Sequence, residues 1–285
     1  MKREAMFYEK LKDNKVHCFL CPHNCVIENG TFGKCGVRAH ENGQLVTINY
    51  GEITSAALDP IEKKPLYYFK PHTQIFSVGS FGCNFTCGFC QNYTISQSVA
   101  KSQFVSKEDL VDTVLSMKDN IGIAFTYNEP SIWYEYVYDS AKLLKETSPD
   151  KAVVVVTNGY IQEEPLKKLL PYVDAMNIDL KSFNTIYYKD LCGGNLIPVL
   201  ETIERAARAC HVEITTLLVS GENDKLTEVE EIAKFLSNIS PEIPLHLSRY
   251  FPRYKLENPP TDVELMKNAE KTAKKYLNKV SLGNI

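Results

Sequence analysis

Beyond residue 70 the chain alternates between short apolar runs and longer amphipathic stretches, and this alternation restricts the folds open to it. The runs are rich in Val, Ile and Leu and short, as strands buried inside a parallel sheet are. They cover residues 75–78, 122–126, 152–157, 175–179, 212–219, 245–249 and 280–282. Helical patterns lie between them, at residues 107–117, 132–146, 162–170, 196–210, 227–237 and 263–277. Strands that alternate with helices predict βα units around a parallel sheet.

Six or seven βα units make an incomplete barrel of the TIM type, since a closed barrel needs eight units in about 250 residues. We therefore predict an α/β fold with a partial TIM-type (β/α)6 barrel over residues 71–285. Residues 1–70 are predicted to form a small N-terminal Cys-rich metal-binding segment and a connector. Pro60 and Pro65 disfavour helix at the residues before them, so residues 59–67 should be extended.

Three cysteines, Cys83, Cys87 and Cys90, lie within one short loop with the spacing C-x3-C-x2-C. Cuboidal iron–sulfur clusters are normally held by four cysteines, so a loop with three leaves one iron open to another ligand. Structural zinc sites usually close with four ligands, and a set of three fits them poorly. The spacing therefore predicts a [4Fe–4S] cluster, and the alternatives are a zinc loop or three buried thiols.

Polar residues follow the apolar runs where the predicted strands end. They include Glu129, Asn158, Asp179 and Lys181. The carboxyl ends of barrel strands meet on one face, where barrel enzymes carry out their chemistry. Each residue alone has a structural explanation. Glu129 suits a helix start before a proline, Asn158 suits a turn, and the last two suit a surface ion pair. Their shared position predicts a single site.

A few residues have two interpretations. His246 alternates with leucines in the run 245–249, which fits either a packed histidine or a contact to adenine or substrate. Cys192 and Cys210 are expected to be buried apolar groups, although the Gly-rich setting of Cys192 leaves a reactive role open. An aromatic group fits either helix packing or the approach of a bulky substrate, and its members are Trp133, Tyr134, Tyr136 and Tyr138.

These segments resemble the radical SAM superfamily, whose cluster loop has the same spacing and an aromatic residue, here Phe89, before the third cysteine. Within it the chain looks like the glycyl-radical-activating branch, which includes pyruvate formate-lyase-activating enzyme, and like the radical SAM protein of the AmmeMemoRadiSam system. The resemblance spans nearly the whole chain and includes residues 21–25, 59–67, 90–97, 128–130, 157–159, 179–181, 248–250 and 282–285.

The resemblance implies roles for the matching residues. The three cysteines of the loop would hold a [4Fe–4S] cluster whose open iron is chelated by S-adenosylmethionine (SAM). Glu129 would accept a hydrogen bond from the SAM amino group. Asn158, Asp179 and Lys181 would line the ribose and carboxylate side of SAM, and Phe89 would lie beside the cofactor.

Two positions depart from the family pattern. Tyr127 and Asn128 stand where the family has Gly-Gly before its glutamate, so the backbone approach to SAM is expected to differ. Thr215 stands where the activating enzymes often have an arginine, which removes one expected contact to the SAM carboxylate.

The implied reaction is reductive cleavage of SAM to methionine and a 5′-deoxyadenosyl radical that abstracts hydrogen from a substrate. Activation of a glycyl-radical protein is one version of this oxidoreductase chemistry, and it implies a protein or peptide substrate and an electron donor of the ferredoxin or flavodoxin type. A radical SAM methylase or peptide modifier is one alternative. A non-catalytic iron–sulfur or zinc binding module is another, but such a module needs neither a barrel nor a polar rim.

A second group of cysteines precedes the barrel, with the spacing C-x2-C-x3-C-x9-C. It consists of Cys18, Cys21, Cys25 and Cys35. Four thiolates complete a closed metal site, so we predict structural zinc or a second iron–sulfur cluster. Disulfides or free thiols remain as alternatives, and His17 and His23 are adjacent potential ligands.

Composition and charge limit the partners and the compartment. The formal net charge is -3, and no basic face argues for nucleic acid. No apolar run approaches the roughly 20 residues that a membrane span needs, and the N-terminus lacks the apolar stretch of a secretory signal. Seven of the nine cysteines fall in two tight groups, which favours metal over disulfides and a cytoplasmic location.

Overall fold

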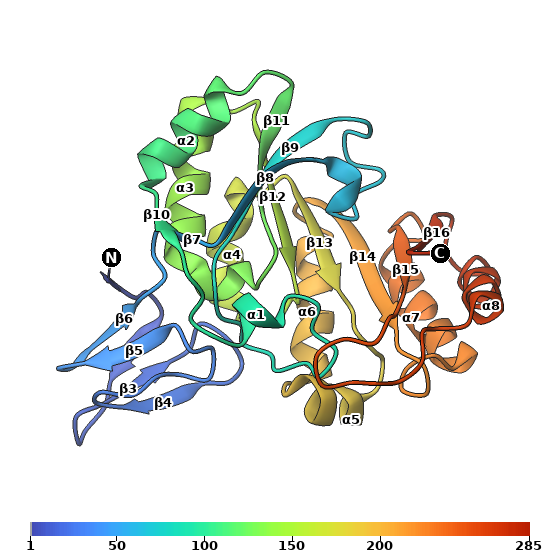
Figure 1. Ribbon diagram of the computed structural model, residues 1–285, viewed down its shortest axis with the longest axis horizontal. Coiled ribbons are helices and arrows are strands. Elements are labelled where there is room, and N and C mark those ends of the chain that lie inside the picture. The colour runs from blue at the N-terminus through green and yellow to red at the C-terminus, as the bar shows by residue number, and fades with distance from the viewer. Residues whose placement is uncertain (1) are drawn as a thin grey trace.

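The computed structural model describes residues 2–285, and its largest element is an eight-stranded sheet (Figure 1). Seven strands run parallel, and β8 pairs antiparallel with β9 at one edge. From edge to edge the order is β16 (Val280–Gly283), β15 (Leu245–Arg249), β14 (His211–Leu218), β13 (Ala175–Asp179), β12 (Ala152–Thr157), β11 (Asn120–Phe125), β9 (Gln74–Gly79) and β8 (Ser55–Pro60). Within residues 2–285 the edge strands β16 and β8 do not pair with each other. The sheet is therefore not closed, and the predicted partial barrel is confirmed.

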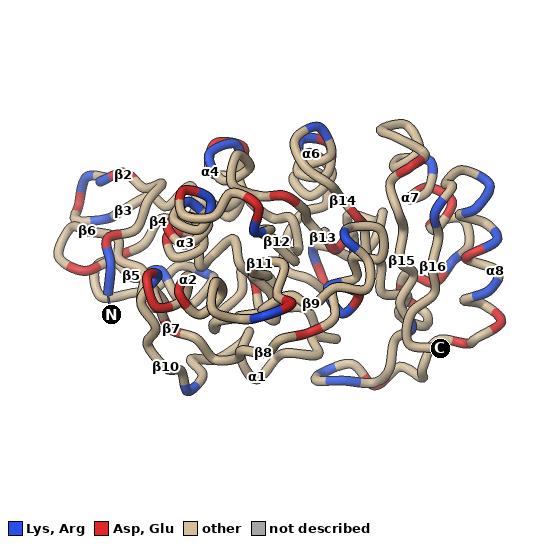
Figure 2. Tube along the Cα trace, turned by 90° about the horizontal axis from the view of Figure 1, so that it is seen from above, with Lys and Arg blue, Asp and Glu red and all other residues tan. Residues whose placement is uncertain are grey.

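Helices connect successive parallel strands, and Figure 2 shows α3, α4, α6 and α7 in a row along one side of the sheet. Apolar residues spaced three and four apart bury one face of each helix, as Val229, Ile232 and Leu236 do in α7. The six helical patterns of the sequence correspond to α2 (Lys107–Ser116), α3 (Tyr134–Thr147), α4 (Glu163–Leu169), α6 (Leu196–Ala206), α7 (Leu226–Ile239) and α8 (Val263–Ala273).

Short helical segments lie in the loops, and the sequence patterns did not predict most of them. Their brevity leaves no room for a helical period to show. They are η1 (Ile61–Lys63), α1 (Tyr93–Ser96), η2 (Pro130–Trp133), η3 (Leu170–Tyr172), α5 (Thr185–Tyr187) and the π-helical η4 (Tyr188–Cys192).

The N-terminal residues form two small antiparallel sheets beside the barrel. One sheet has the order β2 (Tyr8–Lys10), β3 (Lys15–Cys18) and β4 (Cys25–Glu28), and the other β1 (Arg3–Glu4), β6 (Gln44–Thr47) and β5 (Arg38–Glu41). A further pair joins β7 (Glu52–Ile53) to β10 (Gln103–Phe104). A buried ion pair between Arg38 and Glu135 of α3 ties these sheets to the barrel.

The connector between β8 and β9 differs in part from the extended chain that we predicted. Residues 61–63 form the turn η1, in which Lys64 N donates to Ile61 O at 2.9 Å. Each proline restricts only the residue before it. Pro60 and Pro65 therefore leave residues 61–63 free to turn, and the prediction of an extended connector is wrong there.

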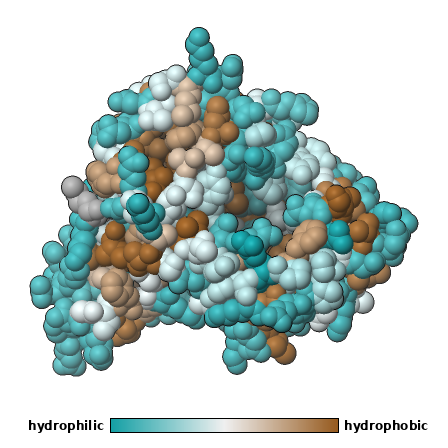
Figure 3. All heavy atoms as spheres, viewed as in Figure 1, coloured by the Kyte–Doolittle hydropathy of each residue, from teal (hydrophilic) through white to brown (hydrophobic). Residues whose placement is uncertain are grey.

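The surface seen in Figure 3 has polar residues over most of its outline and apolar residues in separate patches. Scattered exposed apolar side chains are normal for a folded chain and need no special role. Across residues 2–285, none of the helices has both the length and the apolar character that crossing a bilayer requires.

Candidate active site

A cavity of about 620 Å³ is lined by residues of the sheet and of the loops that connect its strands. The sequence-predicted residues of the barrel all line it, and they are Cys83, Cys87, Phe89, Cys90, Glu129, Asn158, Asp179 and Lys181. They come from the loop after β9 and from the ends of β11, β12 and β13. The parallel register brings these carboxyl ends to one edge, which is why residues far apart in sequence share one cavity.

Backbone contacts hold the cysteine loop at the end of β9. Thr86 N donates to Cys192 O at 2.8 Å, and Gly88 N donates to Leu191 O at 3.1 Å, so the loop rests on η4. Gly82 has a positive φ of 86° and lies against the Cys35 carbonyl, which a Cβ would approach to 2.8 Å. Glycine is therefore required where the N-terminal segment meets the loop.

The three thiols of the loop have different surroundings. Burial, and then the nearby Glu129 carboxylate, raises the pKa of Cys83 well above its usual value. A hydrogen bond with the Cys192 thiol, together with the Lys181 cation, lowers the pKa of Cys87 despite its burial. Iron would be needed to keep Cys83 as a thiolate in this setting.

Hydrogen-bond donors around the loop fit an iron–sulfur cluster. Cys83 Sγ accepts from Phe85 N at 3.3 Å and from Asn158 Nδ2 at 3.7 Å. The buried Tyr187 hydroxyl has no hydrogen-bond partner within residues 2–285, and burial, followed by the nearby Cys192 and Cys87 thiols, raises its pKa well above the usual value. Such donors to cluster sulfur are among the means by which proteins set cluster properties. The residues present therefore suit the cofactor that the cysteine spacing indicates.

Glu129 is buried and links the ends of β11 and β12. Its Oε1 accepts from Ser131 N at 2.9 Å and from Thr157 Oγ1 at 2.6 Å, and its Oε2 accepts from Asn158 N at 2.8 Å. The residue therefore caps η2, as its position before Pro130 suggested. A carboxylate has about four acceptor sites, so one remains for a ligand donor. Burial raises the pKa of Glu129 in spite of these three bonds.

Asn158 contacts the cysteine loop as well as the cavity. Its Nδ2 donates to Asn84 Oδ1 at 2.8 Å, and its Oδ1 accepts from Tyr160 N at 2.8 Å. The side chain thus bridges the end of β12 and the loop. The predicted role toward the SAM ribose would have to coexist with these bonds.

Asp179 and Lys181 form an ion pair in the wall of the cavity, with Lys181 Nζ 2.8 Å from Asp179 Oδ2. Burial alone would lower the pKa of Lys181, but Asp179 and Cys87 raise it well above its usual value. Lys181 thus stays charged and can serve a carboxylate ligand. The ion pair expected from the sequence is present, and both of its residues also line the cavity.

Tyr127 occupies the position where the resemblance leads one to expect glycine. Its φ is 71°, in the left-handed region that favours glycine. A tyrosine therefore adopts here a backbone conformation that glycine takes more readily. Its ring covers the Lys64 ammonium at 4.7 Å, and its hydroxyl donates to Asp59 Oδ2 at 2.9 Å.

Sequence reasoning missed the cavity residues Lys64 and Tyr67, and it also missed Glu213, which supports His246. The signal for the first two was the distinctive segment 59–67. The signal for Glu213 was its charge, which is unusual inside an otherwise apolar strand. His246 itself is packed and also lines the cavity, so both of its interpretations have support.

Two other expectations have clear outcomes. Trp133, Tyr134 and Tyr136 are almost fully buried in the core, so the suggestion that they line a substrate approach is wrong for them. Cys192 is buried as expected, but it lies beside Cys87. Cys210 donates to Ala206 O at 3.6 Å and is not part of the cavity wall.

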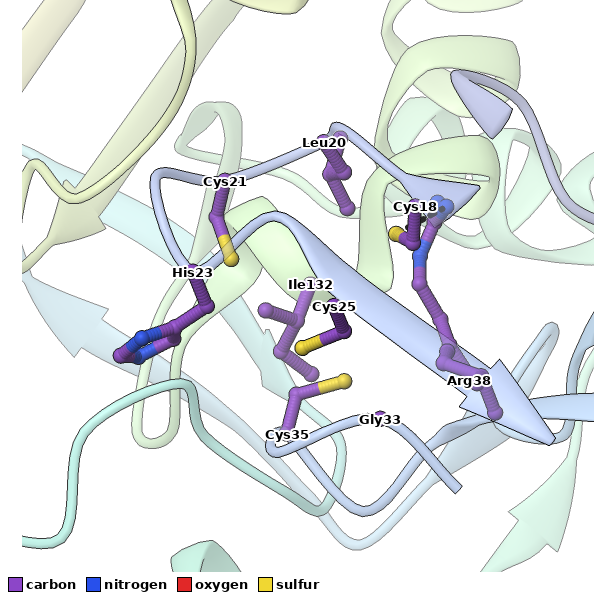
Figure 4. Close-up of a pocket in the computed structure, with 10 residues that line it drawn as sticks. Cys18, Leu20, Cys21, His23, Cys25, Gly33, Cys35, Arg38 and Ile132 are labelled. Atoms are coloured by element: carbon purple, nitrogen blue, oxygen red, sulfur yellow. Dashed lines mark hydrogen bonds between the residues drawn. The ribbon is translucent and has the colours of Figure 1, made fainter. Parts of the chain in front are cut away.

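The four N-terminal cysteines surround one small pocket, which Figure 4 shows with their sulfur atoms turned toward a shared space. Burial raises the pKa of Cys21 to about 12 and also raises that of Cys35. The buried Arg38 donates from Nη1 to Cys18 Sγ at 3.7 Å. The donor set thus fits a thiolate metal site with a cation beside it.

The neighbouring histidines have other partners. His17 contacts Glu9 at 2.9 Å, and His23 Nε2 contacts Asn84 O at 2.7 Å. Across residues 2–285, no three Cys, His, Asp or Glu side chains already gather around a single ion position. The four thiols would have to close by side-chain rotation to hold one zinc ion.

Comparison with known proteins gives consistent matches. Residues 77–236 match the family model described as the radical SAM superfamily. The chain is 43% identical over 290 residues to a Methanocaldococcus jannaschii protein called "Uncharacterized protein MJ0808", covering 99% of this chain and 85% of that protein. It is 25% identical over 213 residues to the pyruvate formate-lyase-activating enzyme of Clostridium pasteurianum, covering 69% of this chain and 87% of that enzyme.

A solved structure supports the fold. The crystal structure of a radical SAM methyltransferase from Sphaerobacter thermophilus superposes with a TM-score of 0.56 at 17% identity, over 75% of this chain and 67% of that one. At this identity the likeness concerns the fold alone.

Proposed function

The chain belongs to the radical SAM superfamily, and on that premise we propose that it cleaves SAM reductively and abstracts hydrogen from a substrate. The observation that carries this proposal is the shared cavity. Three thiols of one loop line it together with polar groups from three successive strand ends. When bound, a [4Fe–4S] cluster supplies the electron that cleaves SAM to methionine and a 5′-deoxyadenosyl radical. The protein's part is to hold, orient and enclose the reactants.

The cavity residues divide this work. Cys83, Cys87 and Cys90 would ligate three irons and leave the fourth for SAM. Glu129 would accept from the SAM amino group through its remaining acceptor site, as a charge-assisted bond. Lys181 would balance the SAM carboxylate while it keeps its contact with Asp179. Asn158 would line the ribose side, and Phe89, which is buried against Tyr187, would enclose the cofactor.

The experiment is anaerobic reduction of the reconstituted protein with SAM, followed by measurement of 5′-deoxyadenosine. We expect the wild type to form it and single Cys→Ala variants at positions 83, 87 and 90 to lose both cluster absorption and product. Cys210→Ala is the matched control because Cys210 lies outside the cavity wall. SAM cleavage that survives in any of the three cavity variants would refute the proposal.

A separate question is which substrate gives up the hydrogen atom. The 25% identity to an activating enzyme supports a protein substrate and activation of a glycyl-radical enzyme. A methylase or a peptide modifier uses the same first step. An electron donor of the ferredoxin or flavodoxin type would supply the reducing electron, and the reducing cytoplasm would suit nine cysteines that are all free thiols within residues 2–285. A glycyl-radical signal on a partner protein after incubation with SAM and reductant would decide for activation.

We also infer that the four N-terminal cysteines bind metal, either structural zinc or a second iron–sulfur cluster. The support is four thiols around one pocket with the Arg38 cation beside them. Metal analysis of a Cys83/Cys87/Cys90 triple variant isolates this site, and the absence of both zinc and iron there would refute a metal role. Since structural metal contributes directly to folding, Cys18→Ala should lower the yield of folded protein.

A further inference from the structure

We propose that the end of the cavity away from the cysteine loop binds the anionic group, a carboxylate or a phosphate, of a small-molecule substrate. We call this end the floor and define it by Lys64, Tyr67 and His246, which all line the cavity. The proposal rests on the proposed function, because it takes the cavity as the place of reaction. It adds the chemical class of the hydrogen donor.

The strand register places the floor and the cysteine loop at opposite ends of the barrel. β8 runs antiparallel to β9, and its last residue, Pro60, pairs with the first residue of β9, Gln74. Lys64 follows β8, whereas the cysteine loop follows the other end of β9. His246 is the second residue of β15, near the same end as Lys64. Figure 1 shows the connection from β8 to β9 and helix α1 at opposite ends of the strands.

Lys64 is a buried cation with donors to spare. Its side chain is 3% exposed, and its Nζ donates to Asp59 Oδ2 at 2.9 Å beneath the Tyr127 ring. That carboxylate is the one hydrogen-bond partner of the ammonium within residues 2–285, while a lysine carries three N–H donors. A buried ammonium is costly unless it is paired and hydrogen-bonded. Two donors at the wall of a cavity therefore indicate a ligand.

The Asp59 carboxylate is shared among several donors. It accepts from Lys63 at 3.1 Å and from Tyr127 Oη at 2.9 Å in addition to Lys64. Burial alone would raise the pKa of Asp59, but these bonds hold it at about 2. Two lysines thus share one carboxylate.

His246 is supported by a second buried carboxylate that has no acceptor left. Glu213 Oε2 contacts His246 Nε2 at 2.7 Å and accepts from Tyr67 N at 3.0 Å. Glu213 Oε1 contacts His211 Nε2 at 2.9 Å and accepts from Tyr68 N at 2.8 Å. These four contacts fill the four acceptor sites of a carboxylate. When both ring nitrogens of His246 carry protons, Nε2 donates to Glu213 and Nδ1 is left to donate to an anion.

The balance of donors and acceptors selects an anion. Glu213 is fully used and Asp59 is shared by three donors, whereas the Lys64 ammonium has two free donors. A carboxylate or phosphate would supply the acceptors that the two free Lys64 donors lack. The cavity of about 620 Å³ lies within the usual range for small-molecule sites, roughly 300–1,000 Å³, and SAM would fill part of it.

The test uses anaerobic protein reconstituted with iron and sulfide and saturated with SAM. Binding of malonate and of inorganic phosphate is measured by calorimetry at constant ionic strength. We expect the wild type to bind at least one of them, and the preferred probe distinguishes a carboxylate from a phosphate. Lys64→Met should weaken that binding about tenfold or more, since a charge-assisted hydrogen bond is lost. Lys64→Arg, which keeps the charge, should lose less.

The matched control is Lys70→Met, because Lys70 lies in the same connector but is exposed and outside the cavity wall. It should bind the probe as the wild type does. If Lys64→Met does not fold, His246→Gln carries the test with the same expected loss. Binding of neither probe to the wild type, or equal binding to wild type and Lys64→Met, would overturn the inference. Equal glycyl-radical formation on a partner protein by the wild type and by Lys64→Met would also overturn the inference.

The same wild-type sample separates this inference from the proposed function. Formation of 5′-deoxyadenosine without Lys64-dependent anion binding would overturn the inference and leave the proposed function standing. Lys64-dependent anion binding without 5′-deoxyadenosine would support the anion site and refute the proposed function.

Discussion

At the scale of single residues, buried polar groups with more than one task distinguish this cavity. Glu129 caps η2, joins two strand ends and faces the cavity. The sequence indicated both a helix start and a ligand contact for it, and the two tasks are compatible because its carboxylate has a free acceptor site. Tyr187 could not be found in the same way, since nothing in the sequence around it indicates that its hydroxyl is buried without a partner.

Glu129→Gln keeps the side-chain volume and removes the charge. We expect SAM affinity to fall by about 1.5–3 kcal/mol, the usual contribution of a hydrogen bond to a charged group, while the iron content stays unchanged. Calorimetry with the oxidised, cluster-loaded protein measures the affinity. Glu204→Gln on the exposed face of α6 is the control. Unchanged SAM affinity in Glu129→Gln would show that the residue serves only as a helix cap.

Tyr187→Phe should have opposite effects on the empty and the loaded protein. Without a cluster, removal of an unsatisfied buried hydroxyl should raise the free energy of unfolding by about 1–3 kcal/mol. With a cluster, loss of a donor near Cys87 should make the midpoint potential more negative. Denaturation of both forms and a redox titration followed by electron paramagnetic resonance provide the measurements, with Tyr172→Phe as control. A potential equal to that of the wild type would contradict a contact with the cluster.

At the scale of elements, the strands and helices were predictable while their side-chain connections were not. Seven apolar runs and six helical patterns carry strong local periodicity, and each corresponds to an element of the barrel. The contact between Glu213 on β14 and Tyr68 in the connector spans 145 residues. A local pattern carries no information on such a pair. The turn η1 was missed for a related reason, since it depends on a bond between Ile61 N and Thr73 O.

Glu213 should make stability depend on pH in the acid range. Burial alone would raise its pKa, but bonds from His211, His246 and Tyr68 N hold it at about 2, below its ordinary value of 4.5. Its stabilising contribution is therefore complete above about pH 4.5 and is lost as the pH falls toward 2. The loss should amount to about 2–3 kcal/mol. Urea denaturation at several pH values between 6 and 3 measures the free energy of unfolding. This free energy should change less with pH in Glu213→Gln than in Glu204→Gln, and an equal change in the two variants would count against this account.

At the scale of the whole molecule, the partial barrel and its cavity were predictable, but the position of the N-terminal segment was not. Cysteine spacing and strand ends identified the cavity residues because a parallel barrel gathers strand ends on one face. No periodic pattern indicates where two small antiparallel sheets attach. The structure places them beside α3 and the cysteine loop. Gly82 contacts the Cys35 carbonyl, and His23 contacts Asn84 O at 2.7 Å.

One buried tie between the two parts is the pair of Arg38 and Glu135, whose side chains are 1% and 2% exposed. Glu135 Oε1 also accepts from Met6 N at 2.7 Å, and Arg38 Nη1 donates to Met6 O at 2.7 Å. Burial alone would lower the pKa of Arg38, but Glu135 and Cys18 raise it. Arg38 therefore stays charged, and removal of Glu135 would leave it buried without its partner.

Arg38→Met should lower the free energy of unfolding by about 3–5 kcal/mol, the usual cost of breaking a buried ion pair by removing one partner. The double variant Arg38→Met with Glu135→Leu should recover much of that loss, because no isolated charge remains. Denaturant unfolding of the metal-loaded proteins measures both, and limited proteolysis near residue 50 reports whether the N-terminal sheets detach first. If the single variant were as stable as the wild type, or the double variant no better than the single one, the pair would not be what attaches the N-terminal segment to the barrel.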